Sequence, residues 1–484
     1  MLKELERKTP VRLGTSFLGF VLLVGLLGCP APTKPVADDD SVDEKAAPSP
    51  LSLLIVDAPN IGPLIERQWA ARRDGKLTTT EMTVEQFQSN DYQAVKQNDV
   101  VIYPVELVGE LVKRELVQEV PKSIWDSEEF NKKGLFRKSR TRLVQFGLSA
   151  WGTPLGSPQL VLMYRQDVLE QLGVNPPRTW QDFFELTKRL READLKDSEG
   201  KALPTEVDIP MNEQWASVSF LAMCAADIRY RGKISTVFDI DDMNPLVNQK
   251  PFVKKLVAVK EVVDEDDLRM TPADAYRRIL DGESAMAIGW PSAGLLDKQA
   301  GVNRSVQIAR LPGSEDWFDF EEQLPVRRDK DESIHVDSLG FDGRMASVST
   351  TSAETRESFE LISWLANKQI SLLFLPESPS GAPFRASHLG NAERWTGPGL
   401  APEAVDAYVE ILQATDKSNT AFIFPRIPEV KAYRSGMDAA ITSCLAGEIE
   451  PQAALDRVVE QWKAITDNQG QAKQRSWLRK SEGF

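Results

Sequence analysis

The sequence predicts an α/β fold, because short apolar runs alternate with segments of helical periodicity. Residues 51–56 and 99–104 are mostly apolar and have the length of buried strands. The segments that follow them, 61–73 and 105–116, carry apolar residues at helical spacing. Such alternation is typical of parallel strands joined by crossover helices. The chain has 484 residues, too many for one ordinary core, so two lobes are expected.

The N-terminus predicts export from the cytoplasm. Basic residues occupy positions 3, 7, 8 and 12, and residues 13–28 carry no charge. This pattern is that of a signal peptide, and the run is short for a membrane-spanning helix. The sequence Leu26-Leu27-Gly28-Cys29 resembles the lipobox of bacterial lipoproteins, which implies a lipid on Cys29. An uncleaved signal anchor and a secreted chain are the alternatives.

A tether is expected between this signal and the folded part. Residues 29–50 contain five prolines and a run of three aspartates, without an aromatic residue or a leucine. Such a segment cannot bury enough apolar surface to order itself. We therefore expect residues 29–50 to link a lipid-anchored Cys29 to the domain.

Charge and composition exclude several classes of function. The formal net charge of −14 disfavours nucleic acid as a partner. Only His335 and His388 are present, so neither a zinc site nor histidine catalysis is predicted, and no cofactor is expected. Cys224 and Cys444 lie in apolar stretches and are expected to be buried free thiols, with a disulfide as the alternative.

The second part of the chain continues the alternation. Residues 159–164 predict a strand, and Thr179 with Asp182 predicts a capping box at the start of a helix. A helix over 274–280 should lead into a buried strand over 282–290. The last clear helix is expected over 453–465, with an apolar stripe. Residues 468–484 are polar and basic, which predicts a loose C-terminal tail.

Five segments resemble, in order, motifs of the extracellular solute-binding proteins of ABC importers, of the class that includes maltose-binding protein. The most specific is 161–182, VLMYRQDVLEQLGVNPPRTWQD. The segments are 99–121, 151–156, 161–182, 280–290 and 425–456. The resemblance covers most of residues 51–467. It departs from the family in a longer, more charged segment at 318–336, which is expected to form a surface loop.

The resemblance implies a two-lobed periplasmic-binding-protein-like fold of type II, with lobes interleaved in sequence. The first lobe would comprise residues 51–150 and 303–368. The second would comprise 151–302 and 369–467, after a signal peptide at 1–28 and the tether at 29–50, and before the tail at 468–484.

A solute site is expected between the lobes, at the carboxyl ends of strands. The resemblance implies that Trp215 is a ligand-stacking aromatic residue and that Glu213 is an acid of the site. It also suggests Trp290 as a ligand-binding residue. Positions at strand ends, in loops or in late helices add further candidates, although each of them could instead serve the core or a solvated loop. These candidates are Tyr103, Trp151, Tyr433, Asp57 and Asn60. Arg385 is expected to be solvated.

The predicted function is to bind a small solute and deliver it to an ABC permease. The expected solute is a carbohydrate, and the protein is expected to be a monomer. Aromatic candidates suit the apolar faces of sugars, and the two lobes would close on the solute. No GxSxG, SxxK or Walker A motif is present, so no enzyme activity is expected. A ligand sensor or surface lipoprotein without a transporter is the alternative, and a lipoprotein hydrolase is a weaker one.

Overall fold

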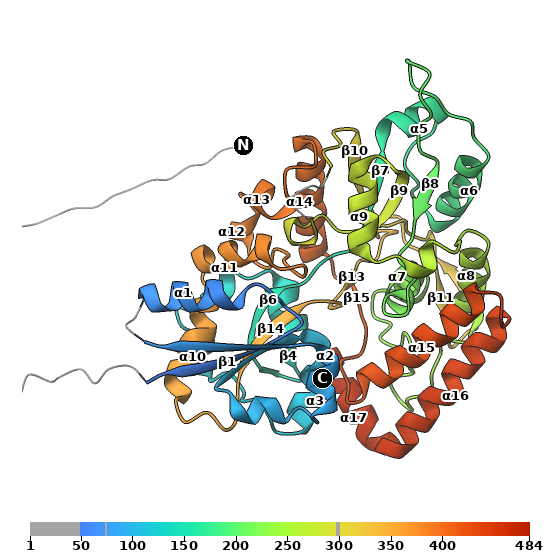
Figure 1. Ribbon diagram of the computed structural model, residues 1–484. Coiled ribbons are helices and arrows are strands. Elements are labelled where there is room, and N and C mark those ends of the chain that lie inside the picture. The colour runs from blue at the N-terminus through green and yellow to red at the C-terminus, as the bar shows by residue number, and fades with distance from the viewer. Residues whose placement is uncertain (1–48, 73–74, 297–300) are drawn as a thin grey trace, which may run out of the picture. The chain divides into compact units, whose positions relative to one another are not determined.

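The computed structural model describes residues 49–72, 75–296 and 301–484. The predicted signal peptide, Cys29 and nearly all of the predicted tether lie outside these described residues. Two mixed sheets organise the described chain, and helices pack against both (Figure 1). None of the described helices combines the length and the apolar character that crossing a membrane would require.

The first sheet contains five strands in the order β2-β1-β3-β14-β6. β1 runs parallel to both β2 and β3, whereas β14 is antiparallel to β3 and β6. Four of the five strands come from the first part of the chain, and β14 returns from far along it. The strands are β1 Leu51–Val56, β2 Leu77–Met82, β3 Val100–Pro104, β6 Thr153–Gly156 and β14 Arg344–Val348.

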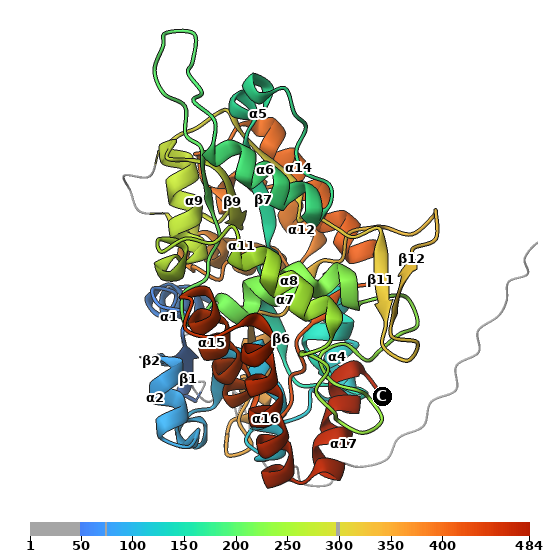
Figure 2. The same cartoon turned by 90° about the vertical axis from the view of Figure 1, so that its right-hand side faces the viewer.

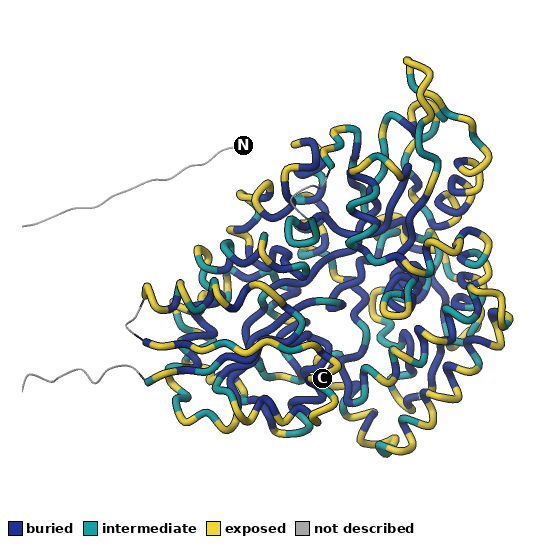
Figure 3. The backbone as a smooth tube through the Cα atoms, in the orientation of Figure 1, coloured by how far each residue is buried: buried dark blue, intermediate teal, exposed yellow. Residues whose placement is uncertain are grey.

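Helices cover both faces of this sheet, which explains why β1 is apolar at consecutive positions. Leu53 and Ile55 pack into one cluster with Trp69 of helix α1 (Gly62–Arg72). Leu54 lies in a different cluster, because successive side chains of a strand point to opposite faces. Burial is nearly complete along β1, β3 and β14, where the tube in Figure 3 is mainly dark blue, whereas the edge strand β2 is largely exposed.

The second sheet contains four strands in the order β10-β7-β9-β8. β8 is parallel to β9, and β7 is antiparallel to both β9 and β10. The predicted boundaries place residues 303–368 in the first lobe. β10 lies within this range, but it pairs with β7 of the second sheet. The strands are β7 Val161–Arg165, β8 Glu206–Asp208, β9 Ser284–Gly289 and β10 Val306–Arg310.

Local sequence signals set the helix starts around the second sheet. The predicted capping box is confirmed at α6 (Trp180–Arg191), where Thr179 and Asp182 each accept a backbone N–H from the other. Helix α9 (Pro272–Asp281) begins with an equivalent box formed by Thr271 and Asp274. Helix α7 (Ala216–Ile228) is buried at almost every position, which explains its nearly continuous apolar sequence. Cys224 and Cys444 are buried and free, as expected.

The C-terminal segment is a helix, which corrects the prediction of a loose tail. Helices α15 (Val430–Leu445), α16 (Pro451–Gln469) and α17 (Gln471–Glu482) follow one another at the end of the chain (Figure 2). In α17, Leu478 is buried and the ring of Trp477 stacks on Phe146 at 5.8 Å. Packing against a residue more than 300 positions earlier therefore stabilises a helix whose own sequence is mostly polar.

The charged segment at 318–336 is partly a hairpin. Strands β11 (Asp316–Asp319) and β12 (Leu324–Arg327) pair antiparallel, and the rest is irregular. The remaining elements are α2 Val84–Ser89, α3 Val108–Lys113, α4 Lys122–Trp125, α5 Gln166–Leu172, α8 Lys250–Lys260, α10 Thr355–Leu365, α11 Lys368–Phe374, α12 Ala386–Leu389, α13 Ala392–Thr396, α14 Pro402–Lys417, β4 Gln145–Phe146, β5 Ser149–Ala150, β13 Ser338–Leu339 and β15 Phe422–Ile423.

The prediction that Arg385 lies in solvent is also wrong. Arg385 is 1% exposed. Its guanidinium donates hydrogen bonds to the carbonyls of Ala366, Phe130 and Asn131. Burial lowers its pKa to about 10, so the group remains charged at neutral pH and holds three separate backbone segments together.

Candidate functional site

Polar side chains gather where the strands of the first sheet end. β1 and β3 are parallel, so the residues that follow them, Asp57 and Glu106, leave the sheet at the same edge. β14 is antiparallel to β3 and begins at this edge, with Arg344 opposite Pro104. In α/β folds this carboxyl edge is the usual place for ligand binding.

Arg344 fixes the loop that follows β1. Its Nη2 donates to the carbonyl of Asp57 at 2.7 Å, and its Nη1 lies 3.0 Å from a carboxylate oxygen of Asp342. Asp57 has φ +50°, a left-handed conformation that aspartate tolerates better than most residues. Its carboxylate accepts the N–H of Val84 at 3.0 Å. Burial raises the pKa of Asp57, and the charge of Arg344 opposes this effect.

Glu106 forms an ion pair with two cations of α15. Its carboxylate oxygens lie 2.6 Å from Lys431 Nζ and 2.5 Å from Arg434 Nη1. Burial alone would raise the pKa of Glu106, but Arg434 and Lys431 together lower it to about 2. Glu106 is therefore ionised at neutral pH, and it joins the end of β3 to the C-terminal helices.

Aromatic residues gather where the strands of the second sheet end. β8 and β9 are parallel, so the segment 209–215 and Trp290 leave this sheet at one edge. The ring centroids of Trp215 and Trp290 are 5.4 Å apart, and that of Phe341 lies 6.1 Å from Trp215 and 5.9 Å from Trp290. Trp215 is partly exposed, whereas Trp290 is 1% exposed.

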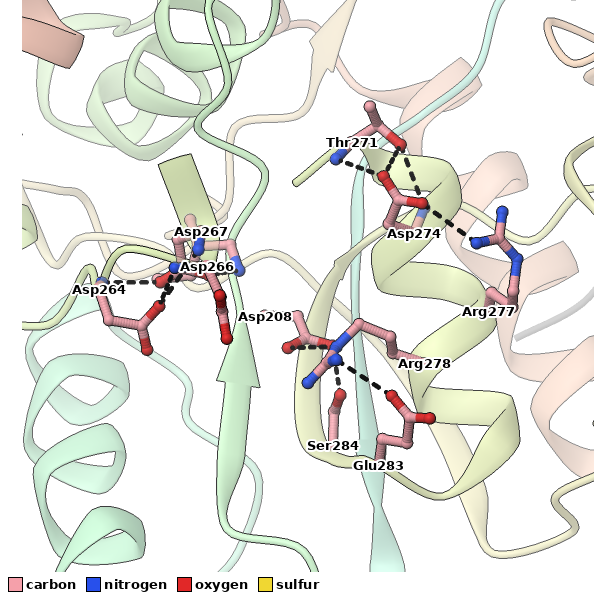
Figure 4. Close-up of polar contacts among 11 residues, drawn as sticks. Asp208, Asp264, Asp266, Asp267, Thr271, Asp274, Arg277, Arg278, Glu283 and Ser284 are labelled. Atoms are coloured by element: carbon pink, nitrogen blue, oxygen red, sulfur yellow. Dashed lines mark hydrogen bonds and ion pairs between the residues drawn. The ribbon is translucent and has the colours of Figure 1, made fainter. Parts of the chain in front are cut away.

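Buried aspartates hold the backbone that leads to Trp215. Asp267 Oδ1 accepts the N–H of Ile209 at 2.7 Å, and its carbonyl accepts the N–H of Met211 at 3.1 Å. Asp208, at the end of β8, accepts hydrogen bonds from Ser284 and Arg278 (Figure 4). Burial raises the pKa of Asp267 to about 8 and that of Asp208 to about 6; Ser284 and Arg278 oppose the latter increase.

Arg434 connects the two groups of residues. Besides its bond to Glu106, its Nη2 donates to the carbonyl of Gln214 at 3.3 Å, directly before Trp215. A hollow of about 30 Å³ lies here and is lined by Glu106, Arg434, Ser217, Phe341 and neighbouring apolar side chains. This volume holds one or two water molecules, so the hollow is too small for a sugar in this conformation.

Several predicted residues lie near this hollow or at the same edges. Trp215 and Trp290 contact Phe341, which lines it. Glu213 is exposed in the turn before Trp215. Asn60 is exposed at φ +74°, in the loop of Asp57.

Three aromatic candidates lie elsewhere. Tyr103 is 0% exposed inside the first sheet, and its hydroxyl bonds to Ser347 Oγ at 3.0 Å. Tyr433 is also 0% exposed, and it packs edge-on against Trp462. The hydroxyl of Tyr433 also has a buried partner, Thr466 Oγ1 at 2.9 Å, so both tyrosines are core residues. Trp151 is partly buried and donates its indole N–H to the carbonyl of Phe146 at 3.2 Å.

Glu106, Arg434 and Phe341 were not among the site residues predicted from the sequence. Glu106 carried a usable signal, because it is the first acid after the apolar run 100–105 and so lies at a strand end. Arg434 directly follows Tyr433 in the same helix. The local sequence does not indicate which of the two side chains points out of the core. Phe341 lies after a short strand that has no periodic pattern.

Neither histidine belongs to this site. The ring of His388 is 0% exposed and bonds to Ser371 Oγ at 2.8 Å, and burial with the nearby Arg385 lowers its pKa to about 3. His335 Nδ1 bonds to the carbonyl of Leu311. Across the described ranges, histidine, cysteine and acidic side chains do not gather in threes that could hold a metal ion.

Comparisons with known proteins identify a family by its sequence model and a fold by similar solved structures. A family model described as bacterial extracellular solute-binding protein matches residues 83–370. MalE3 of T. maritima, in its maltose-bound structure, is 16% identical, with a TM-score of 0.64 over 86% of this chain and 100% of that one. An ABC transporter solute-binding protein from Agrobacterium radiobacter K84, in complex with ribitol, is 17% identical, with a TM-score of 0.65 over 87% of this chain and 99% of that one.

A third structure extends this set. An ABC transporter solute-binding protein from Thermotoga lettingae, bound with α-D-tagatose, is 14% identical, with a TM-score of 0.62 over 86% of this chain and 100% of that one. The family match over residues 83–370 includes β3, β6 and β14 of the first sheet and all four strands of the second, and it begins after β1 and β2.

Proposed function

Because this chain belongs to the bacterial extracellular solute-binding proteins, we propose that it binds a carbohydrate or polyol at the facing edges of its two sheets and delivers it to an ABC permease. The solved structures with this fold were obtained with maltose, ribitol and tagatose. The observation that carries the proposal is the aromatic cluster of Trp215, Trp290 and Phe341 beside the Glu106–Arg434 ion pair.

The chemistry of this cluster suits a sugar. The apolar C–H face of a sugar ring packs on an aromatic ring, and the partly exposed Trp215 is the ring that offers such a surface. Hydroxyl groups need donors and acceptors, which Glu106, Arg434 and Lys431 supply. Binding is the whole function in this proposal, without a chemical step.

Closure of two lobes is the proposed mechanism. The lobes follow the sheets, with the chain passing between them more than once, because β14 joins strands from the start of the chain. The hollow of about 30 Å³ has to widen before a sugar enters. Contacts from both edges would then favour a closed form around the solute, and the permease would bind that form.

We also propose that the protein is a lipid-anchored monomer outside the cytoplasm. The support is the lipobox-like sequence that ends at Cys29, followed by a proline-rich and acidic tether. Labelling with a fatty-acid probe should mark the wild type, and Cys29→Ser should abolish the label. A labelled Cys29→Ser variant, or an unlabelled wild type, would exclude the anchor.

Isothermal titration with maltose, ribitol, tagatose and mannitol tests the proposed solute. At least one of them, or a related saccharide, should bind, and Trp215→Ala should weaken binding without a lower melting temperature. Trp125→Ala is a matched control, because Trp125 is also partly buried but lies at α4. If the wild type and Trp215→Ala bind the solute with equal affinity, the solute does not bind at this edge of the sheet.

A further inference from the structure

A second, larger groove lies apart from the hollow at the strand ends. It has a volume of about 1060 Å³, just above the usual range of small-molecule sites. Its walls are the first turns of α6 and α8 and the hairpin β11–β12, which belongs to the segment that departs from the family pattern. None of its lining residues lines the hollow that holds Glu106 and Arg434.

Each acidic side chain of this groove has a hydrogen-bond or ion-pair partner, and three of the five are paired with a cation. Five acids line it: Asp182, Glu185, Asp227, Glu315 and Asp316. Asp182 accepts the N–H of Thr179, Glu185 accepts from Gln181, and Asp227 pairs with Lys255 at 2.9 Å. Glu315 and Asp316 both pair with Arg327. Asp227, Glu315 and Asp316 are therefore neutralised by cations, whereas Asp182 and Glu185 have only neutral hydrogen-bond partners.

Its donors, in contrast, are partly unpaired. Arg178, Lys250 and Lys254 line the groove, are exposed, and form no ion pair with another described residue. Trp180 is 2% exposed and Trp317 is 7% exposed, yet the indole N–H of each lacks a hydrogen-bond partner among the described residues. A buried N–H without a partner is costly, so an acceptor at either indole would be favourable. Each Nε1 is covered by its neighbours, so the ring has to turn toward the groove before a ligand can accept from it.

The backbone adds to this donor character. Helices α6 and α8 both begin at the groove, and helix N-termini carry partial positive charge. Thr179 caps α6, but no side chain caps α8, where the N-cap residue is Gln249. The chain as a whole has a formal net charge of −14. This groove nevertheless brings together cations without an ion-pair partner and N–H groups without an acceptor.

From this imbalance we propose that the groove between α6, α8 and β11–β12 is a second binding site, for a ligand that presents oxyanion groups. A peptide would bring as many donors as acceptors, so it fits less well than an anion. Two sources share the required chemistry: an acidic saccharide with carboxylates, and a free inorganic anion. This site does not depend on the solute proposed for the hollow.

Titration calorimetry with three probes tests the proposal: trigalacturonate, inorganic phosphate and neutral maltotriose. Trigalacturonate or phosphate should bind the wild type, and Lys250→Gln/Lys254→Gln should weaken that binding about tenfold. The charge-matched control is Lys463→Gln/Lys473→Gln, because both lysines are exposed on other helices. Its affinity should equal that of the wild type. Trp317→Phe removes the indole N–H but keeps a ring on Tyr230, and it should also weaken binding.

The outcomes are distinct. Tight binding of trigalacturonate with weak phosphate binding assigns the site to an acidic saccharide, and equal binding of both assigns it to free anions. Equal affinity in the wild type and the Lys250/Lys254 variant overturns the proposal, as does an absence of binding by both anions. Trp215→Ala leaves this titration unchanged if the two sites are separate, so failure at the hollow is distinguishable from failure here.

Discussion

The side chains of Glu106 and Arg434 form an ion pair with atoms 2.5 Å apart, which joins the end of β3 to α15. Their separation along the chain is 328 residues. The Glu106 side chain is 8% exposed and that of Arg434 is 13% exposed. Removing one partner from such a pair leaves an uncompensated charge in a poorly hydrated place, which costs more than the pair itself contributes.

Glu106→Gln should therefore lower the free energy of unfolding by about 3 kcal/mol, the lower end for breaking a buried pair. Urea denaturation followed by circular dichroism measures this value. The double variant Glu106→Gln/Arg434→Met should recover part of the loss, because it removes the stranded charge as well. Equal destabilisation in the single and double variants would mean that the two charges do not interact.

The same pair predicts a dependence on acid pH. Arg434 and Lys431 lower the pKa of Glu106 to about 2, against about 4.3 for an unfolded glutamate. A lowered folded-state pKa contributes stability that is present above pH 4.3 and is lost as the pH falls toward 2. The wild type should thus lose more stability than Glu106→Gln over that interval, and identical acid profiles would contradict the prediction.

Trp215 and Trp290 should respond differently to truncation, although their rings are 5.4 Å apart. Trp215 is partly exposed, so Trp215→Ala should cost solute affinity on the order of 1–3 kcal/mol and little stability. Trp290 is 1% exposed, so Trp290→Ala should lower the free energy of unfolding by about 3–5 kcal/mol. Calorimetric affinities and urea midpoints separate these effects. A fall in the midpoint of Trp215→Ala would place its ring in the core.

Helix α17 should contribute to stability, because Trp477 stacks on Phe146 and Arg142 pairs with Glu482 at 2.8 Å. Trp477→Ala should lower the free energy of unfolding by about 1–3 kcal/mol. Lys473→Ala, on the exposed side of the same helix, should change it by less than about 0.5 kcal/mol. Equal urea midpoints for the two variants would show that the helix is only loosely attached.

Local patterns predicted the parts of the fold that depend on local physics. The strand at 51–56 was predictable because both faces are covered, and the capping box of Thr179 and Asp182 because its partners are three residues apart. The remaining features depend on partners far away in the sequence, so local patterns could not predict them. Tyr103 and Tyr433 were assigned to the site since aromatic residues at strand and helix ends suit ligands and cores equally. Only the contacts with Ser347 and Trp462 decide for the core.

Asp267 makes stability fall as pH rises near neutrality. Burial raises its pKa to about 8, whereas an unfolded aspartate titrates near 3.9. Between roughly pH 4 and pH 8 the folded protein therefore holds a proton that the unfolded chain has released, so the free energy of unfolding decreases with pH and becomes level above about 8. Asp208, whose folded-state pKa is about 6, adds a contribution of the same sign below that pH.

Asp267→Asn should flatten this profile between pH 6 and pH 8, because asparagine carries no titrating proton and its amide oxygen still accepts the N–H of Ile209. Urea denaturation at intervals of one pH unit measures the slope, and the remaining slope below pH 6 belongs to Asp208. Asp406→Asn, at an exposed position of α14, should keep the wild-type profile. If Asp267→Asn also retained the wild-type slope, Asp267 would be ionised in the folded protein, and the N–H groups of Ile209 and Asp264 would be stabilising a buried carboxylate.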